Sequence, residues 1–169
     1  MTILRNGTIA QDPWQTVADD ADLPPSGLVL VNLARYQAGV SVSVDLKLGV
    51  RLPNTADVDQ LWPVVEHAAA IELEFPKVGD GRAYSQARIL RGRLGYRAEL
   101  RASGEGVVQD HVYFLQRCGF DVLVLRADQK PDACVAALKT FTHPYQPAAD
   151  GLPWVMARRR QTRAAVTKA

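Results

Sequence analysis

Cysteine is scarce in this sequence, and its scarcity limits the metal and redox chemistry that the side chains can support. The 169 residues include only Cys118 and Cys134, sixteen positions apart. That spacing matches neither a Cys-x-x-Cys redox pair, a zinc site, a haem attachment motif nor an iron–sulfur ligand set. We therefore expect no structural metal and no cluster, and the sequence assigns no cofactor.

Long apolar runs and the signatures of two enzyme classes are also missing. No stretch approaches the roughly 20 apolar residues that a membrane helix needs, and the start of the chain lacks the basic and apolar parts of a secretory signal. We therefore expect a cytoplasmic protein without a membrane segment. Neither Gly-x-Gly-x-x-Gly nor Gly-x-Ser-x-Gly occurs, which argues against a dinucleotide-binding enzyme and a serine hydrolase.

Acidic residues are absent from the C-terminal end of the chain. Residues 152–169 hold five basic side chains and no acid, whereas the formal net charge of the whole chain is only +2. The basic character therefore lies in the tail, and we expect residues 146–169 to form a flexible basic extension. Because this tail has no interleaved aromatic residues and no defined basic module, nucleic acid is not the expected partner.

What the sequence does have is a repeated strand-then-helix rhythm. A hydrophobic content of 47% suits one globular domain. Residues 1–27 are predicted to form a small β element, with an Asn6-Gly7 hairpin turn, and a linker. Residues 28–145 are predicted to form an α/β domain with a mostly parallel sheet of about five strands. The expected strands are residues 28–33, 48–52, 70–75, 98–102 and 121–125, and the expected helices are residues 57–69, 82–94, 107–118 and 132–141.

This rhythm fits an open doubly wound sheet and a partial βα-barrel equally well. In either fold the loops after the strand carboxyl ends are the expected ligand face. Asp57 or Thr55 and Asp80 are expected to cap the helices that follow them, and Gly95 and Gly119 stand where helices end in a left-handed residue.

The segment from Glu74 to Arg97 combines such a loop with a helix that is rich in arginine. Lys77 and Arg82 lie at the strand-to-helix turn, where free backbone N–H groups favour an anion. Three further arginines lie roughly 9 to 17 Å along the helix axis, too far away to share a small ligand. They could grip an acidic partner. The alternative is a helix cap and turn followed by a solvated face.

Other candidate residues have ordinary structural explanations. His111 and Cys118 fall on the apolar face of the helix predicted from Val107, so we expect a hydrogen-bonded core histidine and a buried, unreactive thiol. Asp110 and Arg117 fall on its polar side, where a solvated position or a bridge to neighbours is expected. Glu105 sits in another strand-end loop, on the same predicted face as Asp80. Together the two acids could support acid–base chemistry, but a cap and a loop are the simpler explanation.

At the arginine-rich segment the sequence resembles the bacterial family of unknown function DUF934. The resemblance rests on a Phe-Pro-Lys run, an Asp-Gly-Arg run, a Tyr-Ser-Gln-Ala-Arg run and an Arg-Cys-Gly-Phe-Asp segment, and it extends from about Leu48 to Leu125. His111 departs from the expected pattern, because relatives are expected to carry glutamine there. The matching residues are Phe75, Pro76, Lys77, Asp80, Gly81, Arg82, Tyr84, Ser85, Gln86, Ala87, Arg88, Asp110, Arg117, Cys118, Gly119, Phe120 and Asp121.

The resemblance implies a place in assimilatory sulfite and sulfate reduction, because such proteins are commonly encoded beside sulfite reductase and are often described as oxidoreductases. We expect an accessory protein or an oxidoreductase of that pathway, with sulfite reductase or another sulfate-assimilation enzyme as partner. A redox role would require a bound flavin, nicotinamide or partner centre. The alternative is a non-catalytic module that binds a phosphorylated or sulfated metabolite or an acidic protein. The candidate ligand-binding residues are Lys77, Asp80, Gly81, Arg82, Tyr84 and Ser85, and the candidate partner-docking residues are Arg88, Arg91 and Arg93.

Overall fold

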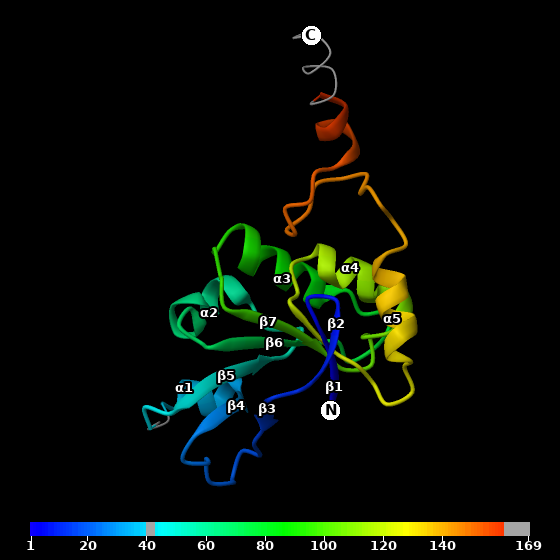
Figure 1. The fold of residues 1–169 in the computed structure, drawn as a ribbon. Helices are drawn as coiled ribbons and strands as arrows, with labels where there is room; N and C mark the ends of the chain where they lie inside the picture. Colours follow the sequence, from blue (N-terminus) through cyan, green and yellow to red (C-terminus); the bar gives the residue numbers. More distant parts are fainter. Residues whose placement is uncertain (40–42, 161–169) are drawn as a thin grey trace.

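A computed structural model describes residues 1–39 and 43–160 and shows one eight-stranded sheet in the order β2-β1-β8-β7-β6-β5-β4-β3 (Figure 1). The strands are β1 (Thr2–Arg5), β2 (Thr8–Gln11), β3 (Trp14–Thr16), β4 (Gly27–Asn32), β5 (Leu46–Leu52), β6 (Ala70–Glu74), β7 (Glu99–Ser103) and β8 (Val122–Val124). The helices are α1 (Leu33–Gln37), α2 (Val58–Val65), α3 (Arg82–Gly92), the short 3₁₀ helix η1 (Gln109–His111), α4 (Val112–Arg117) and α5 (Pro131–Leu138). Within these described ranges, none of the helices has the length and apolar content required to cross a membrane.

The sheet has the strand order of a partial barrel. Strands β3 to β8 are parallel and lie side by side in chain order, and only the β1–β2 hairpin is antiparallel to its neighbours. A doubly wound sheet would reverse its strand order at a switch point, and no such reversal occurs among these strands. The predicted α/β class with a mostly parallel sheet is confirmed. The count of about five strands is wrong, because β1, β2 and β3 extend the same sheet.

The two edges of the sheet lie close together because the sheet curls. Strands β2 and β3 occupy opposite edges, yet only Asp12 and Pro13 separate them in the chain. Three residue steps span at most about 10 Å. The hairpin itself forms as its turn predicts, with Asn6 and Gly7 at φ values of 49° and 80°, the left-handed pair that a tight hairpin requires.

The outer face of the curled sheet holds the main apolar core. Val50, Leu52, Ile71, Leu73 and Leu100 alternate outward from three adjacent strands, are at most 1% exposed, and pack beneath the helices (Figure 1). One predicted helix start and two predicted helix stops are confirmed locally. The Asp57 carboxylate accepts hydrogen bonds from the first turn of α2, and Gly95 and Gly119 adopt positive φ.

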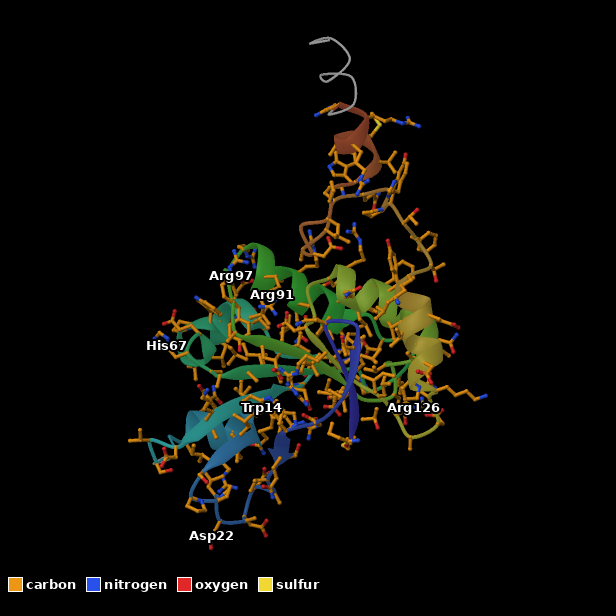
Figure 2. All side chains as sticks on the ribbon, viewed as in Figure 1. Trp14, Asp22, His67, Arg91, Arg97 and Arg126 are labelled. Carbon is orange, nitrogen blue, oxygen red and sulfur yellow. The ribbon has the colours of Figure 1, made fainter. Side chains whose placement is uncertain are left out.

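The inner face carries a row of charges, of which Glu72 and Arg101 are buried. Arg51, Glu72 and Arg101 are directly paired positions on β5, β6 and β7. Arg101 is 0% exposed and donates hydrogen bonds to Glu72 (3.1 Å), Glu99 (2.8 Å) and Asp12. The Trp14 ring lies 5.9 Å from the Arg101 guanidinium carbon. Figure 2 shows Trp14 on the side of the sheet opposite Arg91 of α3. Asp12 lies in the connection between β2 and β3, and Trp14 begins β3. Their contacts with Arg101 hold this connection against the middle of the sheet.

The helix predicted from Val107 begins later than expected. The backbone N–H groups of Val107 and Val108 donate to the carbonyl oxygens of Gly104 and Gly106, respectively, in a tight loop. As a result, η1 starts at Gln109 and α4 starts at Val112. With this later start, Val112 is buried, whereas Phe114 is 56% exposed.

Of the two positions expected for Arg117, solvated or bridging to neighbours, the structure shows the bridge. Arg117 is 9% exposed and donates to both oxygens of Asp150 (2.6 Å each) and to the Gln146 carbonyl. The Ala149 N–H in turn bonds to the Arg117 carbonyl oxygen (3.1 Å). These bonds hold residues 146–150, the start of the predicted basic tail, against α4. Residues 155–160 are helical, and the last part of that tail, residues 161–169, lies outside the described residues.

Candidate functional site

Three strand-end loops come together at the carboxyl ends of β5, β6 and β7. The Phe75 N–H donates to the Ser103 carbonyl oxygen (2.8 Å), and the Gly106 N–H donates to the Phe75 carbonyl oxygen (3.1 Å). A Cβ atom at Gly104 would lie 2.5 Å from the Phe75 oxygen, so glycine is required for the loops to approach this closely. The loop after β7 is thereby fixed against the turn that leads into α3.

Asp80 and Arg82 form a bidentate pair at the start of α3. The Asp80 carboxylate accepts hydrogen bonds from Arg82 Nε (3.0 Å), Arg82 Nη2 (2.6 Å) and the Arg82 backbone nitrogen (3.3 Å). Gly81 is the N-cap residue and supplies no side chain, so Asp80 acts from one position further back. The predicted cap therefore contacts the backbone of the first turn, but its main partner is the guanidinium.

Asn54 is a further potential donor near the same carboxylate. This residue follows β5, is 8% exposed, and contributes to the lowered pKa of Asp80. Its Nδ2 atom nevertheless lacks the geometry of a hydrogen bond and has no partner among the described residues. Since an unpaired buried amide is costly, Asn54 has unused capacity to donate to an acceptor at this turn.

Gln86 joins the β5 loop to α3. Its Nε2 atom donates to the carbonyl oxygens of Pro53 (3.0 Å) and Ala56 (2.8 Å), and its Oε1 atom has no partner within the described ranges. The residue is 5% exposed. Gln86 therefore fixes the Asn54 loop beside the start of α3.

The pKa of Asp80 is lowered, mainly by the side-chain hydrogen bonds from Arg82, and the pKa of Arg82 is raised in return. A carboxyl group whose folded pKa lies below its unfolded value stabilises the fold above the unfolded pKa. That contribution is lost as the pH falls through the folded pKa. The pair therefore stays ionised throughout the physiological range and keeps the turn closed.

The other predicted ligand residues differ in their surroundings. Lys77 and Ser85 are exposed, and neither side chain makes a hydrogen bond or ion pair in the part of the chain that the structure describes. Tyr84 packs edge-on against Phe75 with ring centroids 5.0 Å apart, and burial raises its pKa to about 12. One turn thus contains Lys77, Asp80, Gly81 and Arg82. Tyr84 lies in α3 and packs on Phe75, and Ser85 is exposed to solvent.

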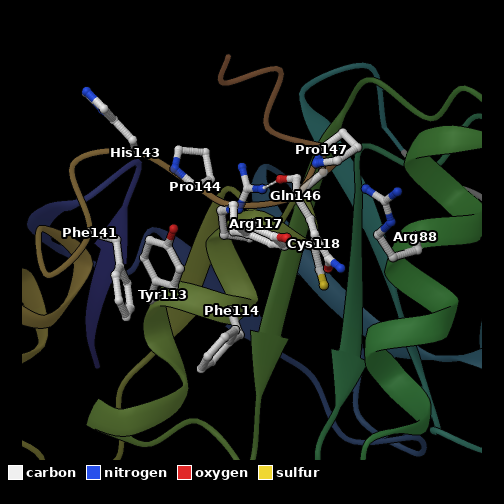
Figure 3. A pocket seen from close by; sticks show the side chains of 12 residues that line it. Arg88, Tyr113, Phe114, Arg117, Cys118, Phe141, His143, Pro144, Gln146 and Pro147 are labelled. Carbon is white, nitrogen blue, oxygen red and sulfur yellow. Dashed lines mark hydrogen bonds between the residues drawn. The ribbon is translucent and has the colours of Figure 1, made fainter. Parts of the chain in front are cut away.

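The three predicted docking arginines have separate environments. Arg91 donates to the backbone oxygens of Gly119, Tyr96 and Ala98 and to the Asp121 carboxylate, so it braces the loops around α3. Arg93 pairs with Asp59 of α2. Arg88 is exposed, has no hydrogen bond or ion pair with any described residue, and lines a groove (Figure 3).

The remaining candidates are structural in their contacts. His111 is half-buried, and its Nδ1 atom lies 3.1 Å from the Gly106 carbonyl oxygen. Both cysteines are free, but Cys118, predicted to be buried, is only half-buried, whereas Cys134 is buried. Desolvation raises the pKa of both thiols. Glu105 is exposed. No group of three or more histidine, cysteine or acidic side chains suited to a metal occurs within the described ranges.

Sequence reasoning missed two features of this region. Asn54 and Gln86 are buried amides whose importance depends on the approach of two loops, and a periodicity argument cannot show that approach. The inner charge row did leave a signal, since Glu72 and Arg101 interrupt apolar strands at alternate positions. A charge in a strand buried on both faces requires a partner, and that requirement predicts the pairing.

Comparison with known proteins gives one match. Residues 49–154 match the model of a family described as a bacterial protein of unknown function, which confirms the resemblance seen in the sequence. No curated protein and no solved structure matches the chain. The matched range includes the three strand-end loops and the segment that Arg117 holds against α4.

Proposed function

Since the chain belongs to the DUF934 family, we propose that it is a cytoplasmic accessory protein of assimilatory sulfite reduction that binds a small oxyanion at the turn between β6 and α3. The resemblance supports the pathway. The geometry of the turn supports the chemistry, and sulfite reductase or another sulfate-assimilation enzyme is the expected partner. The proposal gives this chain a binding role and leaves electron transfer to its partner.

The main observation behind the proposal is that several N–H donors converge on the Asp80 carboxylate. Arg82 supplies two side-chain N–H groups and one backbone N–H group to Asp80, and the buried Asn54 amide also helps to lower the pKa of that carboxyl group. The two parallel N–H groups of a guanidinium suit the paired oxygens of a carboxylate, a sulfite or a sulfate equally. Lys77 lies in the same turn as a cation with no partner in the described chain. The turn is therefore built for an oxyanion.

The Asp80 carboxylate itself occupies the position between these donors. The pair lies at the surface, since the Arg82 and Asp80 side chains are 57% and 18% exposed. An exposed ion pair contributes little net free energy, so an incoming dianion aided by Lys77 can displace the carboxylate. On displacement the Asn54 amide gains the acceptor that it lacks.

Removing the internal carboxylate is expected to strengthen oxyanion binding. Asp80→Ala should bind sulfite and sulfate at least about tenfold more tightly than the unchanged protein, because a carboxylate no longer competes for the charge-assisted donors. Arg82→Ala and Lys77→Ala should bind more weakly. Isothermal titration calorimetry at constant ionic strength measures these affinities.

Asp132→Ala is the matched control, because Asp132 is an exposed acid in the first turn of another helix, α5. It should bind as the unchanged protein does. Absence of binding to both the unchanged protein and Asp80→Ala would contradict the oxyanion site. Equal tightening in Asp80→Ala and Asp132→Ala would show only an effect of net charge.

The pathway is tested by growth of the bacterium that encodes the chain. A deletion strain should grow on sulfide but not on sulfite or sulfate as sole sulfur source, because the block lies at sulfite reduction. The unchanged gene should restore growth, and a gene carrying Lys77→Ala and Arg82→Ala should not. Growth on sulfate equal to that of the parent strain would remove the pathway assignment, while the calorimetric result would still decide the site.

A further inference from the structure

A groove of about 490 Å³ lies between α3, α4 and residues 141–148. In Figure 3, Arg88 projects from α3 on one side, Tyr113, Phe114 and Phe141 lie on the other, and residues 143–147 pass above them. Arg88 lies six residues after Arg82, roughly 9 Å along the helix axis, so the groove is distinct from the turn proposed above and does not depend on it.

Aromatic side chains on the rim of this groove remain exposed to water. Phe114, Phe141 and Tyr145 are 56%, 57% and 78% exposed. Tyr113 joins them, with its ring centroid 5.0 Å from that of Phe141 and 5.6 Å from that of Phe114. A cluster of exposed aromatic rings is unusual on a monomer and typically marks an interaction surface.

A second hollow of about 480 Å³ continues the surface past this aromatic cluster. It lies between η1, α4 and α5, and it shares Tyr113, Phe114 and Phe141 with the first. The shared rings therefore stand between two adjoining depressions. An extended or helical peptide could place a side chain in each, whereas a small molecule would leave one of them empty.

The charge around the groove identifies the occupant. No acidic side chain lines the 490 Å³ groove, and the acid that lines the second hollow, Asp110, lies on the far side of the aromatic cluster from Arg88. Of its two arginines, Arg117 is neutralised by Asp150, whereas Arg88 has no ion pair with any residue that the structure describes. The chain's own end, residues 161–169, carries two basic residues and no acid. It therefore has the wrong sign to complement Arg88.

We propose that this groove docks an acidic segment of a partner protein, with an aromatic or aliphatic side chain of that segment inserted beside Phe114 and a carboxylate paired with Arg88. Arginine and aromatic residues are the types that dominate binding energy at protein interfaces. Arg88 thus keeps the docking role predicted from the sequence. Arg91 and Arg93 act within the fold.

The test starts from a library of random dodecapeptides displayed on phage and selected on the full chain. Selected peptides should be enriched in Asp or Glu next to Phe, Trp or Leu. One of them, synthesised with a fluorescein label, then reports dissociation constants by anisotropy. Arg88→Glu and Phe114→Ser should each weaken binding by about tenfold or more, as loss of a central anchor does.

Arg97→Glu is the matched control, because Arg97 is also exposed but does not line the groove; its binding should change less than about twofold. Each variant is first checked for an unchanged circular dichroism spectrum and melting temperature. Enrichment of basic peptides, no enrichment, or binding that neither groove variant weakens would overturn the proposal. So would a self-association in sedimentation equilibrium that Phe114→Ser abolishes, which would identify the occupant as a second copy of the chain.

Discussion

Replacing Arg101 by alanine is expected to lower the free energy of unfolding by about 3–5 kcal/mol, the usual cost of removing one partner from a buried ion pair. Arg101 is 0% exposed and bonds to Asp12, Glu72 and Glu99. Its loss leaves Asp12 without a cation partner among the described residues, and leaves Arg51 and Arg5 as the remaining cation partners of Glu72 and Glu99. The Trp14 ring also loses the cation beneath it.

Urea denaturation with linear extrapolation measures the effect. The matched control is Arg97→Ala, which removes an exposed arginine and should change the unfolding free energy by less than about 0.5 kcal/mol. Because Asp12 belongs to the segment that joins the sheet edges, hydrogen exchange in Arg101→Ala should accelerate first in β2 and β3. A loss of stability no larger than that of the control would show that the buried row does not hold the curl together.

Local features of the fold could be predicted from the sequence because each depends on residues close together in the chain. The Asn6-Gly7 turn adopts its expected left-handed conformation, and Asp57 caps α2 as expected. The alternation in residues 70–75 predicts β6 and sends Ile71 and Leu73 toward the helices. These patterns also predict the parallel α/β class.

The curling of the sheet could not be predicted in the same way, because it depends on contacts between residues far apart in the chain. Strand β3 has only three residues, and its place at the far edge of the sheet depends on contacts such as Arg101 to Asp12, separated by 89 positions. A helical wheel places Arg91 at the border of the buried stripe of α3. It does not show that the carbonyl groups of Tyr96, Ala98 and Gly119 surround the guanidinium.

The candidate site likewise combines residues that are close together in the sequence with residues that only the fold brings near. Lys77, Asp80 and Arg82 lie in one turn of the chain, and the sequence brings them together correctly. Asn54 joins them only because Gln86 fastens the preceding loop to α3. A prediction from the sequence therefore finds the charged groups of the turn but misses the neutral donor beside them.

Gly104→Ala is expected to destabilise the protein by about 2–4 kcal/mol, since it combines a strained backbone angle with a backbone collision. Gly104 has φ +100°, and an added Cβ would lie 2.5 Å from the Phe75 oxygen and 3.1 Å from its carbonyl carbon. The Phe75 backbone cannot easily move away, because it is bonded on one side to Ser103 and on the other to Gly106.

Gly92→Ala is the matched control: apart from the adjacent residues and the backbone of its own helix, nothing lies within 4 Å of its added Cβ, and the position ends α3. It should be neutral or stabilise by up to about 1 kcal/mol, because alanine is the better helix former. Both variants are compared by urea denaturation and by sulfite calorimetry in the Asp80→Ala background. If the loop after β7 fixes the ligand turn, Gly104→Ala loses affinity as well as stability. Loss of stability with unchanged affinity would show that Asn54, Lys77 and Arg82 keep their binding arrangement without the support of the loop after β7.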